Sequence, residues 1–178
     1  MARGANSRDG RVARSELTGR SDKAAFRLAI KTFNEGETNR YRKVNLYGEK
    51  LNKMTERDLR FAVGDYISNN LDRLITDSKG NKIDIDEEKK TLGKQAEDRH
   101  EEEAKRYAKE SGENLIDAYD TVDGSSDKRV GFAEIGGKRF TFNYYFTSSV
   151  FEQDEEDRGR RTWQSTSRKI DYDSIKQA

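Results

Sequence analysis

Apolar side chains recur at helical spacing in two segments of the first half of the chain. The first segment begins at Ser21, a residue that suits a helix N-cap, and ends at Gly36. Its apolar members fall on one face of a helix and are Phe26, Ala29, Ile30 and Phe33. This stripe is typical of a face that packs into a core.

The second segment is the strongest helix signal in the chain and covers residues 56–76. Thr55 suits the N-cap, and Asp58 stands where a capping box has Glu, although its shorter carboxylate reaches less well. The apolar positions that follow are Leu59, Val63, Tyr66, Ile67, Leu71 and Leu74. Their spacing predicts one long amphipathic helix with a buried face.

Two shorter stretches alternate between polar and apolar positions, as strands do. In residues 38–48 the alternation predicts a short strand or an extended connector, and Ile83 and Ile85 predict another short strand after a polar turn. The first stretch also mixes cations with tyrosine, at Arg40, Tyr41, Arg42 and Lys43. That mixture is typical of grooves that bind single-stranded nucleic acid, so a nucleic-acid contact is the alternative to a plain amphipathic strand.

Residues 86–113 are dominated by charged side chains with few apolar ones between them. Opposite charges stand four apart, as in Glu101 with Lys105, and such pairs support an exposed helix. The segment predicts a long charged helix that either projects from the body or folds back onto it. Residues 115–119 predict a short amphipathic turn or helix after it.

A β-hairpin is the clearest strand signal. Residues 130–135 and 138–146 flank Gly136 and Gly137, a pair that suits a tight turn. One face of the second strand carries Phe140, Phe142, Tyr144 and Phe146, which we expect to pack on helices. The opposite face carries Arg139 and Tyr145 and is available to a partner.

Both ends of the chain are rich in charge. Residues 1–20 form a basic segment that is either a solubilising tail or an arm for phosphate or an acidic protein, and its cations are Arg3, Arg8, Arg11, Arg14 and Arg20. Residues 151–178 predict a charged tail. It places Arg158, Arg160 and Arg161 near Trp163, and Trp and Arg are common anchors of protein interfaces.

These elements predict an α+β fold. Two or three helices pack on a C-terminal antiparallel hairpin or sheet, and a long charged helix and charged terminal extensions are added to that body. We expect a basic arm at 1–20, a single domain at 21–150 and a charged tail at 151–178.

Composition supports a small body with a large solvated surface. Of 178 residues, 39% are charged and 31% are hydrophobic, and the net charge is only +1. A net charge this low argues against a protein that coats DNA in bulk, while its segregation along the chain favours oriented association with partners. The chain has no cysteine and no stretch of about 18 apolar residues, so we expect a cytoplasmic protein without disulfides or a membrane span.

Catalytic and metal-binding motifs are not evident. His100 is the single histidine, which disfavours histidine-based triads, and Glu97 with His100 makes only half of a di-metal carboxylate motif, so a solvated ion-paired face is expected there. The turn at 77–82 places lysines where a calcium loop needs acidic residues and glycine. Lys138 follows a glycine but lacks the rest of a phosphate-binding loop. We therefore expect no cofactor and no enzyme activity.

The sequence favours a non-enzymatic interaction protein that binds a protein or nucleoprotein assembly. Small proteins of this build are common in viruses and mobile elements, where they join or inhibit a larger machine, in the host cytoplasm or the virion. Direct nucleic-acid binding and a structural role in a self-assembly are the alternatives. Besides the cations of the arm, the candidate contact residues are Arg40, Tyr41, Arg42, Lys43, Lys138, Arg139, Tyr145, Arg158, Arg160, Arg161 and Trp163.

Overall fold

The structure, a computed structural model of the chain, describes residues 21–155 and 159–178, without the side chains of residues 153–162. The chain divides into two compact units. Unit 1 takes the chain up to Tyr66 together with residues 134–139 and Gln177, and unit 2 takes residues 67–133, 140–176 and Ala178. Helix α2 and all three strands therefore contribute residues to both units.

Unit 1 contains α1 (Lys23–Gly36), the short 3-10 turns η1 (Arg40–Arg42) and η2 (Leu51–Lys53), and most of α2 (Glu56–Asn69). The predicted apolar stripe of α1 is buried at Phe26, Ala29 and Ile30. Asp22 rather than Ser21 occupies the N-cap position, while the hydroxyl of Ser21 accepts a hydrogen bond from the Lys23 amide at 3.3 Å.

The predicted capping box starts α2. The Asp58 amide donates to the hydroxyl of Thr55 at 3.1 Å, and the Thr55 amide donates to the Asp58 carboxylate at 3.5 Å. The longer second bond agrees with the limited reach of aspartate at this position. The expected single helix over 56–76 is interrupted at Asn70, and α3 (Leu71–Leu74) is a separate turn of helix.

No strand forms between residues 38 and 48, and the alternative of an extended connector is only partly right, because residues 40–42 form the 3-10 turn η1 and Tyr47 has a left-handed φ of 53°. The side chain of Asn34 bonds both the amide of Val44, at 2.8 Å, and its carbonyl, at 3.2 Å. Asn34 thereby takes the place of a neighbouring strand for Val44, which is buried. The amide and the carbonyl of Val44 therefore have hydrogen-bond partners without a neighbouring strand, and the alternating segment does not pair with the sheet.

Unit 2 is built from helices and a three-stranded antiparallel sheet in the order β1-β2-β3. Its helical elements after α3 are α4 (Ile85–Glu88), a π-helical turn η3 (Lys89–Gly93), α5 (Lys94–Ser111) and α6 (Leu115–Thr121). The strands are β1 (Arg129–Ile135), β2 (Lys138–Glu155) and β3 (Gly159–Gln177). The expected α+β fold is confirmed, as are the long charged helix, the short helix after it and the hairpin.

The expected strand at Ile83 and Ile85 is wrong. The Asp84 side chain accepts hydrogen bonds from the amides of Asp86 and Glu87, at 3.0 and 3.3 Å, and so caps α4. Ile85 is then the first residue of the helical run, and its side chain is buried. Two isoleucines two apart are too short a pattern to distinguish a strand from the start of a helix.

The expected solvated face at Glu97 and His100 is also wrong, because both side chains turn inward. The Glu97 carboxylate accepts a hydrogen bond from the hydroxyl of Thr166 at 2.6 Å. His100 is only 3% exposed, and its Nε2 lies 2.8 Å from the carbonyl oxygen of Tyr119 on α6. These contacts join α5 to β3 and to α6.

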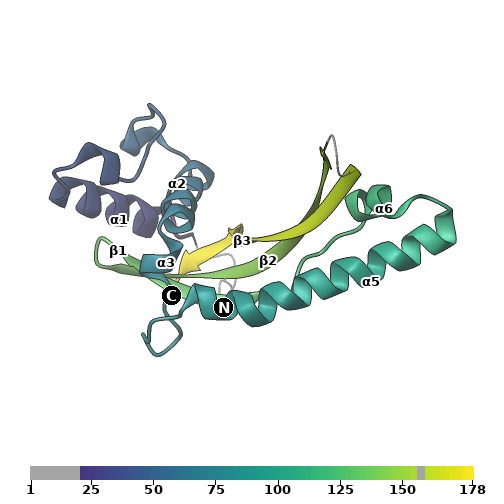
Figure 1. The fold of residues 1–178 in the computed structure, drawn as a ribbon. Coiled ribbons are helices and arrows are strands. Elements are labelled where there is room, and N and C mark those ends of the chain that lie inside the picture. The colour runs from purple at the N-terminus through teal and green to yellow at the C-terminus, as the bar shows by residue number, and fades with distance from the viewer. Residues whose placement is uncertain (1–20, 156–158) are drawn as a thin grey trace, which may run out of the picture. The chain divides into compact units, whose positions relative to one another are not determined.

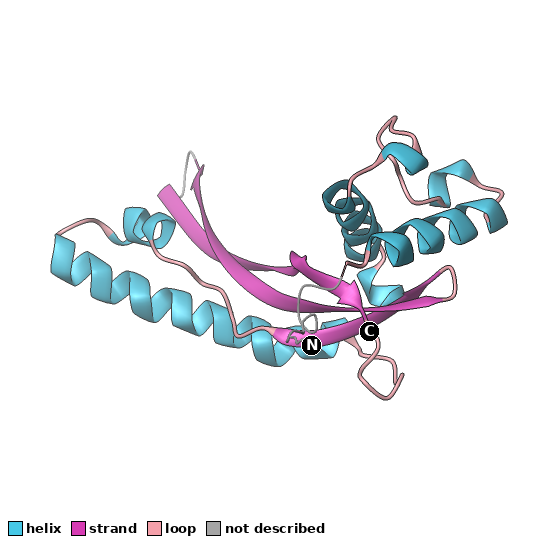
Figure 2. Ribbon diagram, turned by 180° about the vertical axis from the view of Figure 1, so that it is seen from behind, coloured by secondary structure: helices cyan, strands magenta, loops and turns pink. Residues whose placement is uncertain are grey.

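One face of the sheet, here called the inner face, packs on the helical run from α4 to α5 (Figures 1 and 2). As predicted, Phe140, Phe142, Tyr144 and Phe146 are all buried, and the hydroxyl of Tyr144 bonds the carboxylate of Glu88. Burial and this bond raise the pKa of Tyr144 well above its ordinary value. On β3, Thr166, Ile170 and Ile175 are buried too.

Where a tail was expected from residue 151, the structure instead has the end of β2 and the whole of β3. Ile170 and Ile175 are both buried although they are five residues apart. An odd spacing means that the alternation of β3 shifts by one residue between them. Such a segment has no continuous alternating pattern, which is why the sequence did not predict a strand.

Candidate protein interface

The second face of the sheet, here called the outer face, is partly exposed along unit 2. On β2 the buried positions 142, 144, 146 and 148 alternate with positions 141, 143, 145 and 147, which are half-buried, and Ser149 and Phe151 beyond them are exposed. The outer-face residues of β2 are Thr141, Asn143, Tyr145, Thr147, Ser149 and Phe151. This strand therefore presents hydroxyl, amide and aromatic groups to solvent.

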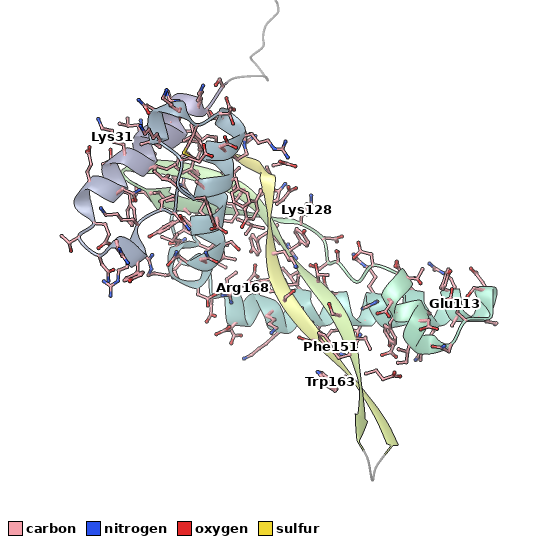
Figure 3. All side chains as sticks on the ribbon, turned by 90° about the horizontal axis from the view of Figure 1, so that it is seen from above. Lys31, Glu113, Lys128, Phe151, Trp163 and Arg168 are labelled. Carbon is pink, nitrogen blue, oxygen red and sulfur yellow. The ribbon has the colours of Figure 1, made fainter. Side chains whose placement is uncertain are left out.

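Two large aromatic side chains meet on the outer face near the end of the β2–β3 hairpin. Phe151 of β2 and Trp163 of β3 are 48% and 47% exposed, and their ring centroids are 5.9 Å apart (Figure 3). A cross-strand aromatic pair stabilises a hairpin by up to about 1 kcal/mol. Half of each ring is nevertheless left in water, and rigid aromatic surface of this kind is what protein interfaces bury at their centres.

A second cluster lies further along the outer face, around Tyr145. The ammonium group of Lys128 lies 5.9 Å from the centre of the Tyr145 ring and 2.6 Å from the carboxylate of Asp171. The bond to Asp171 raises the pKa of Lys128 above its ordinary value, so the lysine stays charged. The ion pair fixes the lysine over the ring and leaves the cluster with no excess charge.

The outer face is therefore rich in aromatic and hydroxyl groups and poor in charge. Its β3 residues from Trp163 onward alternate as Trp163, Ser165, Ser167, Lys169 and Asp171. Over positions 141–151 and 163–171, the charged members are one lysine and one aspartate. Tyrosine, tryptophan, serine and asparagine supply rigid contact area and adaptable hydrogen bonds, the combination that protein-binding surfaces use.

The structure brings only some of the predicted contact residues together. Tyr145 and Trp163 share the outer face of unit 2. Lys138 and Arg139, at the start of β2, belong to unit 1, as do the residues of η1 and Lys43 after it. In η1, Tyr41 is 83% exposed, and the Arg40 guanidinium lies 4.9 Å from its ring centre.

The remaining predicted residues lie outside the described side chains. The arm cations Arg3, Arg8, Arg11, Arg14 and Arg20 fall in residues 1–20, and Arg158 falls in the gap between β2 and β3. Arg160 and Arg161 belong to β3, but their side chains are not described. Their part in an interface remains a prediction from the sequence.

Sequence reasoning missed Phe151, Lys128 and Asp171. Phe151 continues the same alternation as Tyr145, so extending the predicted strand by five residues would have placed it on this face. The contact of Lys128 with Asp171 joins residues 43 apart, and no local pattern reports it.

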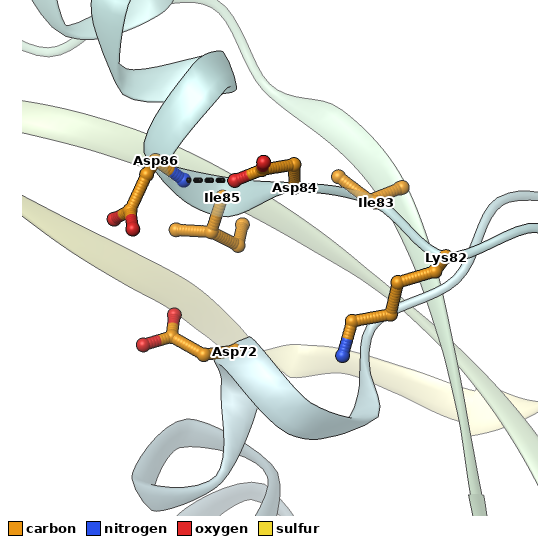
Figure 4. A pocket seen from close by; sticks show the side chains of 6 residues that line it. All are labelled: Asp72, Lys82, Ile83, Asp84, Ile85 and Asp86. Carbon is orange, nitrogen blue, oxygen red and sulfur yellow. Dashed lines mark hydrogen bonds between the residues drawn. The ribbon is translucent and has the colours of Figure 1, made fainter.

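No metal site accompanies the interface in the described part of the chain. Three carboxylates, of Asp72, Asp84 and Asp86, line a hollow of about 260 Å³ beside Lys82 (Figure 4). The Asp84 carboxylate already caps α4, and the Asp72 carboxylate forms an ion pair with the guanidinium of Arg168 at 2.9 Å. Over residues 21–155 and 159–178, no group of three or more histidine or acidic side chains is arranged to hold a metal ion.

Comparisons with models of protein families, with curated proteins and with solved structures find no match to this chain. Among the helices that the structure describes, none combines the length and apolar character needed to cross a lipid bilayer. The candidate interface therefore rests on the geometry of the outer face.

Proposed function

We propose that this chain is a non-enzymatic protein-binding protein and that the outer face of its sheet is the contact surface. The observation that carries the proposal is the exposed pair of Phe151 and Trp163, with ring centroids 5.9 Å apart. Large aromatic side chains left half in water gain transfer free energy when a partner covers them. The hydroxyl and amide groups along the same strands supply the polar contacts that such an interface needs.

A protein partner suits the outer face better than a nucleic acid does. Binding to a phosphate backbone draws much of its affinity from Lys and Arg side chains that neutralise phosphates. Lys128 beside this face is already paired with Asp171, and unit 2 as a whole has 18 Lys and Arg against 24 Asp and Glu. A net charge of −6 repels polyanions, whereas a neutral aromatic and hydroxyl surface accepts another protein.

The test is site-specific photo-crosslinking in native lysate. A benzophenone side chain at Ser165, which is exposed on the outer face, is expected to capture a protein partner, and the same group at the exposed Arg106 of α5 is not. The substitutions F151S and W163S should each reduce capture by at least about tenfold without unfolding the chain, because interface aromatics dominate binding energy. Equal capture at the two positions, or capture that W163S leaves unchanged, contradicts the proposal.

Nucleic-acid binding is a second candidate, and the observation that favours it is the charge of unit 1. The described residues of this unit hold 12 Lys and Arg against 8 Asp and Glu, and residues 1–20 add a further net charge of +3. This candidate predicts a gel shift at about 50 mM salt that is lost steeply by about 200 mM. No shift of single- or double-stranded probes at the lower salt removes it.

A further inference from the structure

Unit 1 contains a pocket that the proposed interface of unit 2 does not use. The pocket has a volume of about 400 Å³, near the lower end of the range for sites that bind small ligands. Its apolar walls are Leu46, Tyr47, Met54 and Phe61. Met54 is buried, whereas the rings of Tyr47 and Phe61 are each about half exposed, so the walls run from the interior to the surface.

The backbone at Tyr47 is held in an unfavourable conformation that keeps its ring in the pocket wall. Tyr47 has a φ of 53°, a left-handed value that a tyrosine rarely adopts and that no other described non-glycine residue shares. Its amide donates to the Asn45 side chain at 2.8 Å, and its hydroxyl bonds the carboxylate of Asp65 on α2. Its ring lies 5.9 Å from that of Phe61. Strain that the surroundings hold in place is typical of binding sites.

A guanidinium group that has no partner among the described residues stands in the pocket lining. Arg57 is exposed, and it makes no hydrogen bond or ion pair with any described residue. It occupies the first turn of α2, where the helix dipole disfavours a cation. Because the helix dipole does not favour this cation and the pocket beside it is open, the guanidinium of Arg57 is available to bind a ligand anion.

The chain around the pocket attracts acidic partners. Residues 40–57 contain six Lys and Arg against Glu49 and Glu56, a net charge of +4. Glu56 is already engaged, because it accepts hydrogen bonds from Ser21 at 2.6 Å and from Arg60 at 2.9 Å. The remaining cations give this part of the surface a positive potential that favours negatively charged ligands.

We propose that the pocket binds an acidic peptide segment of another protein through one large apolar side chain. The apolar side chain enters between Tyr47 and Phe61, and a neighbouring carboxylate pairs with Arg57. Single-stranded nucleic acid fits less well, because the carboxylates of Glu49 and Asp58 also line the pocket and Asp65 lies against the Tyr47 hydroxyl. A nucleic acid carries a phosphate at every nucleotide, so some phosphates would meet these carboxylates, whereas a peptide can place a single carboxylate against Arg57 and none against Glu49 and Asp58.

The experiment titrates a peptide into the full ¹⁵N-labelled chain and follows amide chemical shifts. The peptide is capped at both ends and carries a Phe-Leu pair with glutamates on one side and glycine and serine on the other. One control peptide replaces the pair with two serines, and the other replaces the glutamates with lysines. We expect shifts clustered in residues 46–61, with at least about tenfold weaker binding for each control peptide.

Matched protein variants separate the pocket from the general charge of unit 1. F61S and R57Q should each weaken binding at least about fivefold. L28S removes another half-exposed apolar side chain of unit 1 outside the pocket and should leave binding unchanged, as should W163S on the outer face of unit 2. Because W163S alters the outer face and not the pocket, peptide binding that F61S weakens and W163S leaves unchanged reports on the pocket alone. The result therefore does not depend on whether the proposed interface is correct.

Several results would overturn the inference. Equal binding of the serine peptide means that charge alone attracts the ligand, and tighter binding of the lysine peptide means that the carboxylates of the rim dominate. An oligothymidine probe that binds with shifts in residues 46–61 and is weakened by F61S reassigns the pocket to nucleic acid. A mass that rises with concentration in wild type and not in F61S assigns it to a second copy of the chain.

Discussion

The single histidine of this chain acts as a packing residue. The carbonyl oxygen of Tyr119 can only accept a hydrogen bond, so the Nε2 of His100 must donate to it, at 2.8 Å. The Tyr119 ring lies edge-on to the imidazole, with centroids 4.8 Å apart, and Gly124 lies directly against it. A side chain so enclosed holds α6 against α5.

We expect the substitution G124A to destabilise unit 2. A Cβ at this position would lie 2.8 Å from the Cβ and Cγ atoms of His100 and 2.9 Å from its Nδ1, closer than packed atoms allow. Overpacking of a buried site costs roughly 1–3 kcal/mol, which urea unfolding followed by circular dichroism measures. G36A is the control, because nothing lies within 4 Å of its Cβ. Equal stabilities for the two variants would refute the contact.

Glu56 makes the stability of unit 1 depend on pH. The hydrogen bond from Ser21, then the contacts with Arg60 and the Asp22 backbone, lower the pKa of this carboxyl below its ordinary value of 4.5, although burial opposes them. A group whose pKa is lower in the folded state contributes stability above its unfolded pKa and loses it as pH falls through the folded value.

The corresponding variant is E56Q. It should be less stable than wild type at about pH 7, and the difference should shrink as the pH falls below about 4, because protonation removes the same interactions from wild type. Urea unfolding across this range measures the difference. The control is E35Q, which removes an exposed carboxylate of α1 that makes no hydrogen bond or ion pair with a described residue, so it should show no trend of this kind. A pH-independent difference for E56Q contradicts the assignment.

At the scale of elements, the β1–β2 hairpin turn is fitted closely to α1 within unit 1. Both Gly136 and Gly137 have positive φ, of 56° and 79°, which glycine adopts without strain. A Cβ on Gly136 would lie 2.2 Å from the carbonyl oxygen of Ala29, whereas a Cβ on Gly137 would meet nothing within 4 Å. The two glycines therefore have different roles in one turn.

This difference predicts that G136A destabilises the chain more than G137A does. G137A should cost about 1 kcal/mol from the backbone conformation alone. G136A adds a clash with main-chain atoms that no side-chain rotation relieves, so we expect a further loss of at least about 1–2 kcal/mol in thermal or urea unfolding. Equal losses would mean that the turn and α1 separate without cost.

The elements that the sequence predicted best are those with a continuous local pattern. The apolar stripe of α1, the capping box of α2 and the Gly-Gly hairpin each lie within about 20 residues, and each appears in the structure. Strand β3 has no such pattern, since its alternation shifts between Ile170 and Ile175. The pairing of Phe151 with Trp163 depends on the register between two strands, which neither strand reports alone.

At the scale of the whole molecule, charge separates with the two units. Counted over all of their residues, unit 1 has a net charge of +7 and unit 2 has a net charge of −6. The sequence showed that charge is segregated along the chain. The boundary between the two units could not be read from it, because residues 134–139 of the hairpin belong to unit 1 while the residues on either side of them belong to unit 2. Surfaces of opposite sign suit different classes of partner.

The two modes of binding should therefore respond differently to salt. Capture through the outer face should change little between about 50 mM and about 500 mM salt, because its contacts are aromatic and hydroxyl groups. A nucleic-acid complex of unit 1 should weaken by a factor of about 10³ or more over a similar range if it contacts six or more phosphates. The salt dependence of capture through the outer face is measured by the crosslinking yield from Ser165 in a salt series. A steep loss of this yield with rising salt would show that charge holds the partner.

Trp163 is the only tryptophan in the chain, and its indole is 47% exposed. Its intrinsic fluorescence is consequently a built-in, label-free reporter of the outer face. A partner that covers the ring would move the emission to shorter wavelength as water leaves the indole, and a ligand that occupies only the pocket of unit 1 would leave the spectrum as it was. One optical titration of the unmodified chain thus distinguishes its two candidate binding surfaces.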